Sequence, residues 1–230
     1  NVEDLKGAPS FVFAPQLPVV DKVIGTLEGE MELNPGEVKW PEEAKSILAV
    51  AVEHPEDKPE LDWWYGQISP SGNKLLINAV KEMCEWIPAN FNIDVSHFPY
   101  FIEQGGIYLK DAAVLAGLGC IGRNNMLVTP EFGPRVRLRA MALNIPIPST
   151  GPSGFDPCVQ CDDLCRKACP QHAFDEPVYS PETYNQVILP GRDGSYARAT
   201  CHIQIRKNSD EAKEQVPVGF SKSVKAIKFC

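Results

Sequence analysis

Residues 158 to 170 read Cys-Val-Gln-Cys-Asp-Asp-Leu-Cys-Arg-Lys-Ala-Cys-Pro. This segment, here called the cysteine run, holds four of the eight cysteines of the 230-residue chain. Bacterial ferredoxins use the spacing Cys-x2-Cys-x2-Cys-x3-Cys-Pro, and the cysteine run differs from it by one extra residue in the middle gap. The spacing therefore predicts thiolate ligands of a [4Fe–4S] cluster at Cys158, Cys161, Cys165 and Cys169.

Other uses of these cysteines stay open. Four cysteines can also bind zinc, although zinc motifs usually separate two pairs by a longer loop. A disulfide framework would need an oxidising compartment, and unligated core thiols would seldom be so crowded. In two-cluster ferredoxins the last cysteine of such a run binds the other cluster, which is a role open to Cys169. Cys201 and Cys230 are further candidate ligands, so one cluster is expected, or two if ligands other than these cysteines complete the second.

The residues before the cysteine run alternate between strand and helix patterns. The nearly continuous apolar segment 46–52 predicts a strand covered on both faces. Apolar residues three and four apart over 73–87 predict an amphipathic helix, which we expect Pro88 to end. A second helix is predicted over 108–116, with Gly117 as its stop. Further strands are predicted at 92–98, 125–129 and 136–145.

This interleaving predicts an α+β fold of α/β-like character. Four prolines and two glycines between Ile145 and Pro157 indicate a linker. We therefore expect one domain over residues 1–147 and an iron–sulfur domain over residues 148–230.

The net charge and hydropathy of the sequence limit the kinds of partner that we expect the protein to bind. Lysine and arginine total 22 against 30 acidic residues, a net charge of −8, so a general nucleic-acid surface is disfavoured and nucleic acid is expected to be an unlikely partner. No apolar run is long enough to cross a bilayer, and no signal peptide is visible. We expect a cytoplasmic protein without a membrane partner.

The residues before the linker supply a second motif. Residues 116 to 124 read Ala-Gly-Leu-Gly-Cys-Ile-Gly-Arg-Asn, and a glycine-rich loop alone usually means a tight turn. Together with the later proline-rich strand end and the cysteine run, however, this segment resembles the superfamily of epoxyqueuosine reductases and corrinoid-dependent reductive dehalogenases. The resemblance covers roughly residues 100 to 205.

The resemblance implies a nitroreductase-like core joined to a C-terminal ferredoxin-like iron–sulfur region, with cobalamin held between them. It implies that Glu103 supplies a proton, with a surface carboxylate as the alternative, and that a tyrosine such as Tyr108 or Tyr100 acts in catalysis. Cofactor contacts are expected from Gly105, Gly119, Gly122, Arg123 and Asn124, with capping of the turn as the alternative role of Arg123 and Asn124.

Three arginines alternate along the predicted strand 136–145 and its start, namely Arg135, Arg137 and Arg139. Because alternate strand residues share a face, these side chains would either neutralise an anionic ligand or form a solvated face, and the second is favoured. Cys84 is expected to be a core thiol, whereas Cys120 is expected either in the core or in a pocket.

The function expected from these features is that of an iron–sulfur reductase that passes electrons from the cluster to a bound corrinoid and a small substrate. The alternative is an electron-transfer protein without its own corrinoid, which reduces a partner such as a corrinoid protein. A ferredoxin or flavodoxin is the expected electron donor. Epoxyqueuosine reductases carry helical repeats for tRNA after the cluster region, and dehalogenases usually carry a twin-arginine leader. Neither is visible here, so tRNA reduction is not expected.

Overall fold

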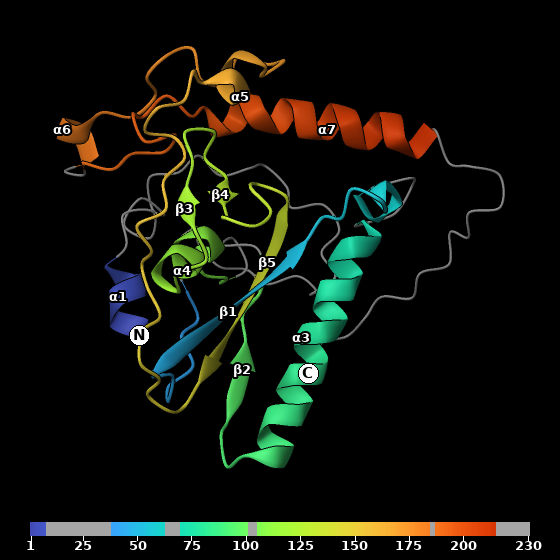
Figure 1. Cartoon of the computed structure of the whole chain (residues 1–230), viewed down its shortest axis with the longest axis vertical. Coiled ribbons are helices and arrows are strands. Elements are labelled where there is room, and N and C mark those ends of the chain that lie inside the picture. The colour runs from blue at the N-terminus through green and yellow to red at the C-terminus, as the bar shows by residue number, and fades with distance from the viewer. Residues whose placement is uncertain (8–37, 63–69, 101–104, 185–186, 215–230) are drawn as a thin grey trace.

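The computed structural model describes residues 1–7, 38–62, 70–100, 105–184 and 187–214. Its main sheet has three antiparallel strands in the order β1-β5-β2, which are β1 (Ser46–Glu53), β5 (Val136–Leu143) and β2 (Val95–His97). Strand β5 is central, because it pairs with β1 from Ser46↔Leu143 to Glu53↔Val136 and with β2 from Val95↔Leu143. Figure 1 shows this sheet beside the long helix α3 (Ser71–Asn90).

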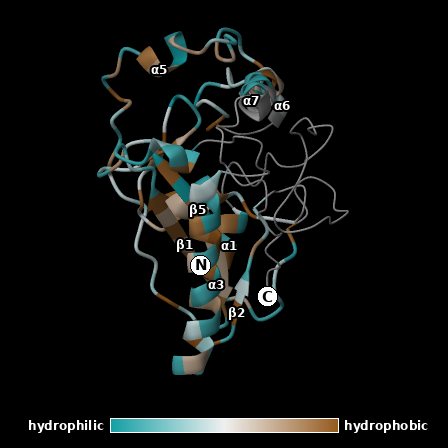
Figure 2. Cartoon of the chain, turned by 90° about the vertical axis from the view of Figure 1, so that its right-hand side faces the viewer, coloured by the Kyte–Doolittle hydropathy of each residue, from teal (hydrophilic) through white to brown (hydrophobic). Residues whose placement is uncertain are grey.

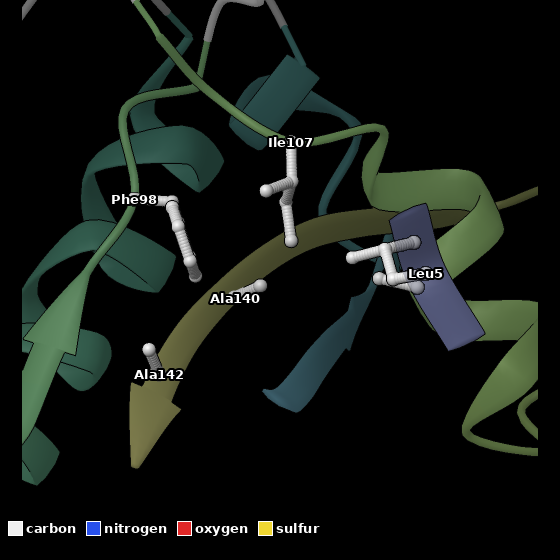
Figure 3. Packing of buried hydrophobic residues seen from close by; sticks show 6 residues of the cluster. Leu5, Phe98, Ile107, Ala140 and Ala142 are labelled. Carbon is white, nitrogen blue, oxygen red and sulfur yellow. The ribbon is translucent and has the colours of Figure 1, made fainter. Parts of the chain in front are cut away.

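Two helices cover the other face of the sheet. They are α1 (Val2–Lys6) and α4 (Leu109–Leu115), whose side chains pack on Ala140 and Ala142 of β5. Figure 3 shows Phe98 and Ile107 lying over these two alanines, with Leu5 of α1 at the edge of the cluster. Met141 points the opposite way, because neighbouring strand residues face opposite sides, and packs with α3. Figure 2 shows the apolar residues gathered where α1, β1 and β5 meet.

The remaining elements are short, apart from the last helix. A 3-10 turn, η2 (Pro59–Asp62), precedes α3, and a two-stranded hairpin joins β3 (Cys120–Ile121) to β4 (Leu127–Val128). Beyond the main sheet lie α5 (Leu164–Lys167), α6 (Pro181–Tyr184) and α7 (Arg198–Glu214), which Figure 1 shows at the hairpin end of the molecule. No described helix is long and apolar enough to cross a membrane.

The prediction of a mixed helix and strand fold is confirmed. The predicted strand 46–52 is β1, and Ile47 faces the α4 side while Leu48 and Val50 face α3. The predicted stop at Gly117 is also present, since Gly117 has a φ of 77° and follows Ala116, the C-cap of α4. The domain boundary near residue 147 stays a prediction.

The prediction that Pro88 ends the amphipathic helix is wrong. Helix α3 runs on to Asn90, and the amide of Phe91 donates to the carbonyl oxygen of Ile87 at 2.9 Å. Proline removes one intrahelical hydrogen bond. The loss is confined to the amide of residue 88 itself, and a later amide, that of Phe91, still bonds to Ile87, so the helix continues past Pro88.

Candidate cofactor cavity and cysteine run

A cavity of about 1080 Å³ lies between the main sheet and the C-terminal third of the described chain. Its wall comes from α4, the start of β5, the β3–β4 hairpin and a segment near residues 188–198. Pockets for small molecules usually enclose about 300–1,000 Å³, so this cavity has room for a large ligand.

The wall carries several cationic side chains. They belong to Lys110, Arg137, Arg139, Arg192 and Arg198. Arg137 and Arg139 are each only 6% exposed, so the favoured expectation of a solvated arginine face is wrong for these two residues. The reason is tertiary: β5 is the central strand, and its start forms the cavity wall. Arg135 fits that expectation better, because it lies at the surface and pairs with the exposed Glu56.

Arg137 is held by a polar network at the rim. Its guanidinium pairs with Asp62, and its Nε donates to Asn73 Oδ1 at 3.1 Å. His54 also contacts Asp62, with 2.6 Å between Nδ1 and Oδ1. Burial, together with the charges of Arg137 and Arg135, nevertheless lowers the pKa of His54, although a hydrogen bond to the backbone of Val136 opposes the shift.

Lys110 extends from α4 into the wall. Its Nζ donates to the carbonyl oxygen of Asn125 at 2.5 Å, which ties α4 to the hairpin. Burial of the ammonium group lowers the pKa of Lys110, the nearby Arg198 lowers it further, and Asp111 opposes the shift. A lysine with a lowered pKa gives up its proton more readily than an ordinary lysine.

Two tyrosines of the wall match the expected tyrosine candidates. Tyr108 precedes α4 as its N-cap, and Tyr100 lies beneath Arg139, whose Cζ is 4.3 Å from the ring centroid. Tyr100 therefore has a basic neighbour, which the sequence pattern alone did not assign to it. Glu103, the expected proton donor, lies outside the described residues.

The predicted cofactor contacts of the glycine motif and of Gly105 lie outside the cavity wall. Gly122 packs against the cysteine run, because a Cβ there would be 3.6 Å from Cys158 Sγ and 2.8 Å from Asn124 Oδ1. Gly105 is buried, and its carbonyl oxygen accepts from the amide of Lys39 at 3.3 Å. Arg123 contacts the cysteine run directly, with 3.1 Å between its Nη1 and Asp163 Oδ2. A cofactor role for these residues and for Gly119 stays a prediction.

The cysteine run adjoins this hairpin, and Asp156, just before the run, lines the cavity. Cys158, Cys161, Cys165 and Cys169 are all free thiols, and Cys161 and Cys165 are exposed. The middle gap contains Asp163, which has a left-handed φ of 57° and precedes α5. In the described residues, no three His, Cys, Asp or Glu side chains converge as a metal site. Four cysteine thiols at this spacing are suitable ligands for a cluster. In this structure, however, the four thiols do not converge on one point.

The other candidate thiols are dispersed. Cys201 lies in the first turn of α7 and hydrogen-bonds to Tyr196, whose pKa is raised mainly by burial. Cys120 lies in β3, where Arg192 Nη2 is 3.6 Å from its Sγ, and burial raises the pKa of Cys120. Cys84 packs against the α3 side of the core. Cys230 lies outside the described residues.

Comparisons with known proteins agree with the glycine and cysteine motifs. The chain is 28% identical to an epoxyqueuosine reductase of Lactococcus garvieae over 138 residues, which is 54% of this chain and 38% of that protein. It is 38% identical to a tetrachloroethene reductive dehalogenase of Sulfurospirillum multivorans over 84 residues, covering 36% and 16% of the two chains. The chain is a relative of these two groups of reductases. The resemblance expected from the sequence is confirmed, and these matches span less than two fifths of either relative.

A solved epoxyqueuosine reductase bound to a modified tRNA stem loop also matches. The match has a TM-score of 0.49 and 22% identity, and it covers 73% of this chain and 43% of that one. No family model matches the chain. The comparisons lend no support to the expectation from net charge that nucleic acid is an unlikely partner, which stays a prediction. A nitroreductase-like core and a ferredoxin-like region stay predictions.

Proposed function

We propose that the protein is a reductase in which the cysteine run binds a [4Fe–4S] cluster and the cavity binds a corrinoid beside its small substrate. The observation that carries this proposal is the adjacency of the two sites. Cys158 lies against Gly122 of the hairpin, and the same hairpin forms part of the cavity wall. The relatives support the proposal because both are named as reductases.

The cluster would be held by Cys158, Cys161, Cys165 and Cys169, and the corrinoid by the wall of the cavity. When bound, these groups supply one-electron chemistry that amino-acid side chains do not provide. The chain itself contributes the cavity wall, which shields one side of a bound ligand from water. It also contributes cationic side chains that favour anionic or electron-rich groups in the cavity.

Lys110 and Tyr108 are the described wall residues suited to manage protons. Lys110 Nζ has a lowered pKa and lies beside the cavity, so it can donate a proton to a substrate that has gained electrons. Tyr108 offers a phenolic hydroxyl from the start of α4. The role of Glu103 as a further proton donor stays a prediction.

The second candidate function is electron transfer to a partner without a bound corrinoid. It is favoured by the exposure of the cysteine run, where Cys161 and Cys165 are exposed, Val159 is 75% exposed and Leu164 is 69% exposed. An exposed redox segment can contact a second protein. A ferredoxin or flavodoxin is proposed as the electron donor in both cases.

Metal analysis of anaerobically purified protein tests the proposal. We expect iron, acid-labile sulfide and brown visible absorption in the full chain. Cys161→Ser should lose iron because it removes a ligand, whereas the control Cys84→Ser should retain it because the half-buried Cys84 of α3 packs against the core. One bound zinc without sulfide or colour would overturn the cluster assignment, and equal iron loss in both variants would show that the ligand set is wrong.

A titration with hydroxocobalamin separates the two functions. Binding at micromolar concentration supports the reductase with its own corrinoid. We expect Arg139→Gln to weaken this binding, because Arg139 is buried in the cavity wall. Absence of binding by a protein that carries its cluster would favour the electron-transfer function instead.

A further inference from the structure

One loop touches both the cavity and the cysteine run. We call residues 189–195 the clasp loop. Leu189, Pro190 and Arg192 line the cavity, and the loop is closed by a hydrogen bond of 2.7 Å from the Arg192 amide to the Leu189 carbonyl oxygen. Its side chains reach in two directions, toward the hairpin and toward the cysteine run.

Arg192 makes the link at the first cysteine. Its Nε donates to the carbonyl oxygen of Ile121 at 2.7 Å, which attaches the loop to β3. Its two Nη groups donate to the two carboxylate oxygens of Asp156 at 2.8 and 3.0 Å. Asp156 Oδ1 in turn accepts from the amide of Cys158 at 3.0 Å. The chain of contacts therefore runs from the cavity wall through one guanidinium and one carboxylate to the backbone of Cys158.

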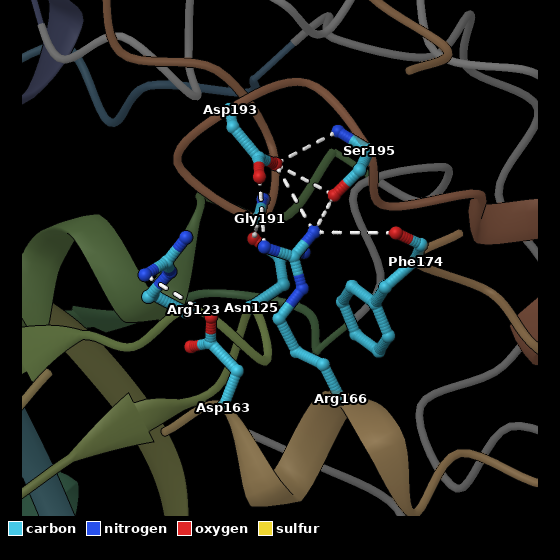
Figure 4. Close-up of polar contacts among 8 residues, drawn as sticks. All are labelled: Arg123, Asn125, Asp163, Arg166, Phe174, Gly191, Asp193 and Ser195. Carbon is cyan, nitrogen blue, oxygen red and sulfur yellow. Dashed lines mark hydrogen bonds and ion pairs between the residues drawn. The ribbon is translucent and has the colours of Figure 1, made fainter. Parts of the chain in front are cut away.

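A second arginine holds the other end of the cysteine run. Arg166 lies between Cys165 and Cys169, and its guanidinium donates to Asp193 at 2.7 and 3.2 Å. It also contacts the Ser195 hydroxyl and the carbonyl oxygen of Phe174, as Figure 4 shows. Figure 4 also shows Arg123 paired with Asp163 beside this network. Both ends of the cysteine run are thus attached to the clasp loop.

The geometry of the Arg192 contact is specific to arginine. A guanidinium is a planar fork that pairs with both oxygens of a carboxylate while a third donor remains for another acceptor. A lysine ammonium carries the same charge but cannot reproduce this arrangement of donors. Charge and geometry at this position can therefore be varied separately.

We propose that Arg192 is a positioning residue, which through Asp156 fixes Cys158 beside the wall of the cavity. The proposal deepens the proposed function and rests on it for its consequence, which is the placement of the redox group held by the cysteine run. Arg192 acts through the carboxylate and the backbone. The contacts of its guanidinium with Ile121 and Asp156 determine where the first cysteine lies.

Alkylation of individual cysteines tests the placement. The reduced full chain without iron is treated anaerobically with iodoacetamide, and modification of each cysteine is followed by mass spectrometry. In Arg192→Lys and in Asp156→Asn, Cys158 should react about tenfold faster, because a charged hydrogen bond that held its segment is lost. Cys84 should be unchanged. The matched control Arg135→Lys alters an exposed ion pair with Glu56 elsewhere and should leave all rates unchanged.

The double variant decides whether the two residues act together. Because both belong to one link, Arg192→Lys combined with Asp156→Asn should react no faster at Cys158 than either single variant. Additive effects would overturn the proposal, as would an unchanged Cys158 rate or equal acceleration at every cysteine. Circular dichroism shows whether each variant folds. If either Arg192→Lys or Asp156→Asn does not fold, the alkylation rate of Cys158 in the remaining single variant tests the proposal.

The redox potential of the protein reconstituted with iron and sulfide gives a readout that a purely structural role would not move. Arg192→Gln removes a cation whose charge also acts on Cys158, the first proposed ligand, and should lower the potential, whereas Arg192→Lys keeps the charge and should retain most of the potential. A tenfold change in the one-electron equilibrium corresponds to about 59 mV. An unchanged potential in Arg192→Gln would overturn the placement of this charge. If the unaltered chain takes up no iron, the proposed function fails, while the alkylation rates still decide the role of Arg192.

Discussion

Replacing Gly119 by alanine should destabilise the hairpin that joins the cavity to the cysteine run. A Cβ at Gly119 would lie 2.0 Å from the carbonyl oxygen of Val128, the strand partner of Cys120. Cβ atoms essentially never approach a heavy atom within 3.0 Å, so the backbone of β4 must move. The obstacle is a backbone atom, which no side-chain rotation can remove.

The magnitude follows from comparison with two other glycines. Nothing lies within 4 Å of a Cβ at Gly154, and Gly154→Ala should be neutral or stabilising by about 0.4–1 kcal/mol. Gly133 has the same open space but a φ of 57°, so Gly133→Ala should cost about 1–2 kcal/mol through left-handed strain. In Gly119→Ala the new Cβ overlaps the backbone of Val128. Such overpacking should cost about 3 kcal/mol, which is the upper end of its usual range.

The assay is equilibrium unfolding of the three variants by urea, followed by far-ultraviolet circular dichroism. For a chain of this length, a free energy of unfolding that is lower by about 3 kcal/mol corresponds to a melting temperature that is lower by roughly 6–12 °C. The expected order of stability is Gly154→Ala, then Gly133→Ala, then Gly119→Ala. A free energy of unfolding for Gly119→Ala within about 0.5 kcal/mol of that for Gly154→Ala would refute the close approach of the two strands.

Two further predictions concern the sheet. Met141→Ala should lower the free energy of unfolding by about 2–5 kcal/mol, because Met141 is fully buried where β5 packs on α3. The control Met126→Ala, at an exposed site, should change it by less than about 0.5 kcal/mol. Burial lowers the pKa of His97 below its ordinary value of about 6.5, so the folded protein resists protonation and its stability should fall as the pH drops through about 6.5. His97→Gln should flatten that dependence, and a fall of unchanged size in this variant would contradict the assignment.

Local patterns determined several elements of this protein by themselves. The sequence predicts β1 from its apolar segment and α3 from the spacing of its apolar residues. Both predictions succeed because the pattern of buried positions appears among residues that are close together in the chain. Gly117 marks the end of α4 for a similarly local reason, since its left-handed φ favours glycine. The cysteine run also predicts its own chemistry, because the ligands of a cluster lie close together in the chain.

The tertiary structure alone decided which charged residues form the site. Arg137 and Arg139 are buried in the cavity wall because β5 is the central strand and its start forms part of that wall. The alternation of arginines in the sequence does not reveal the position of the strand in the sheet. The clasp loop carries no motif. Arg192 meets Ile121 and Asp156 only because the fold brings three distant segments together. Ion pairs of this kind depend on the distance between segments in space, and a sequence pattern encodes only distance along the chain.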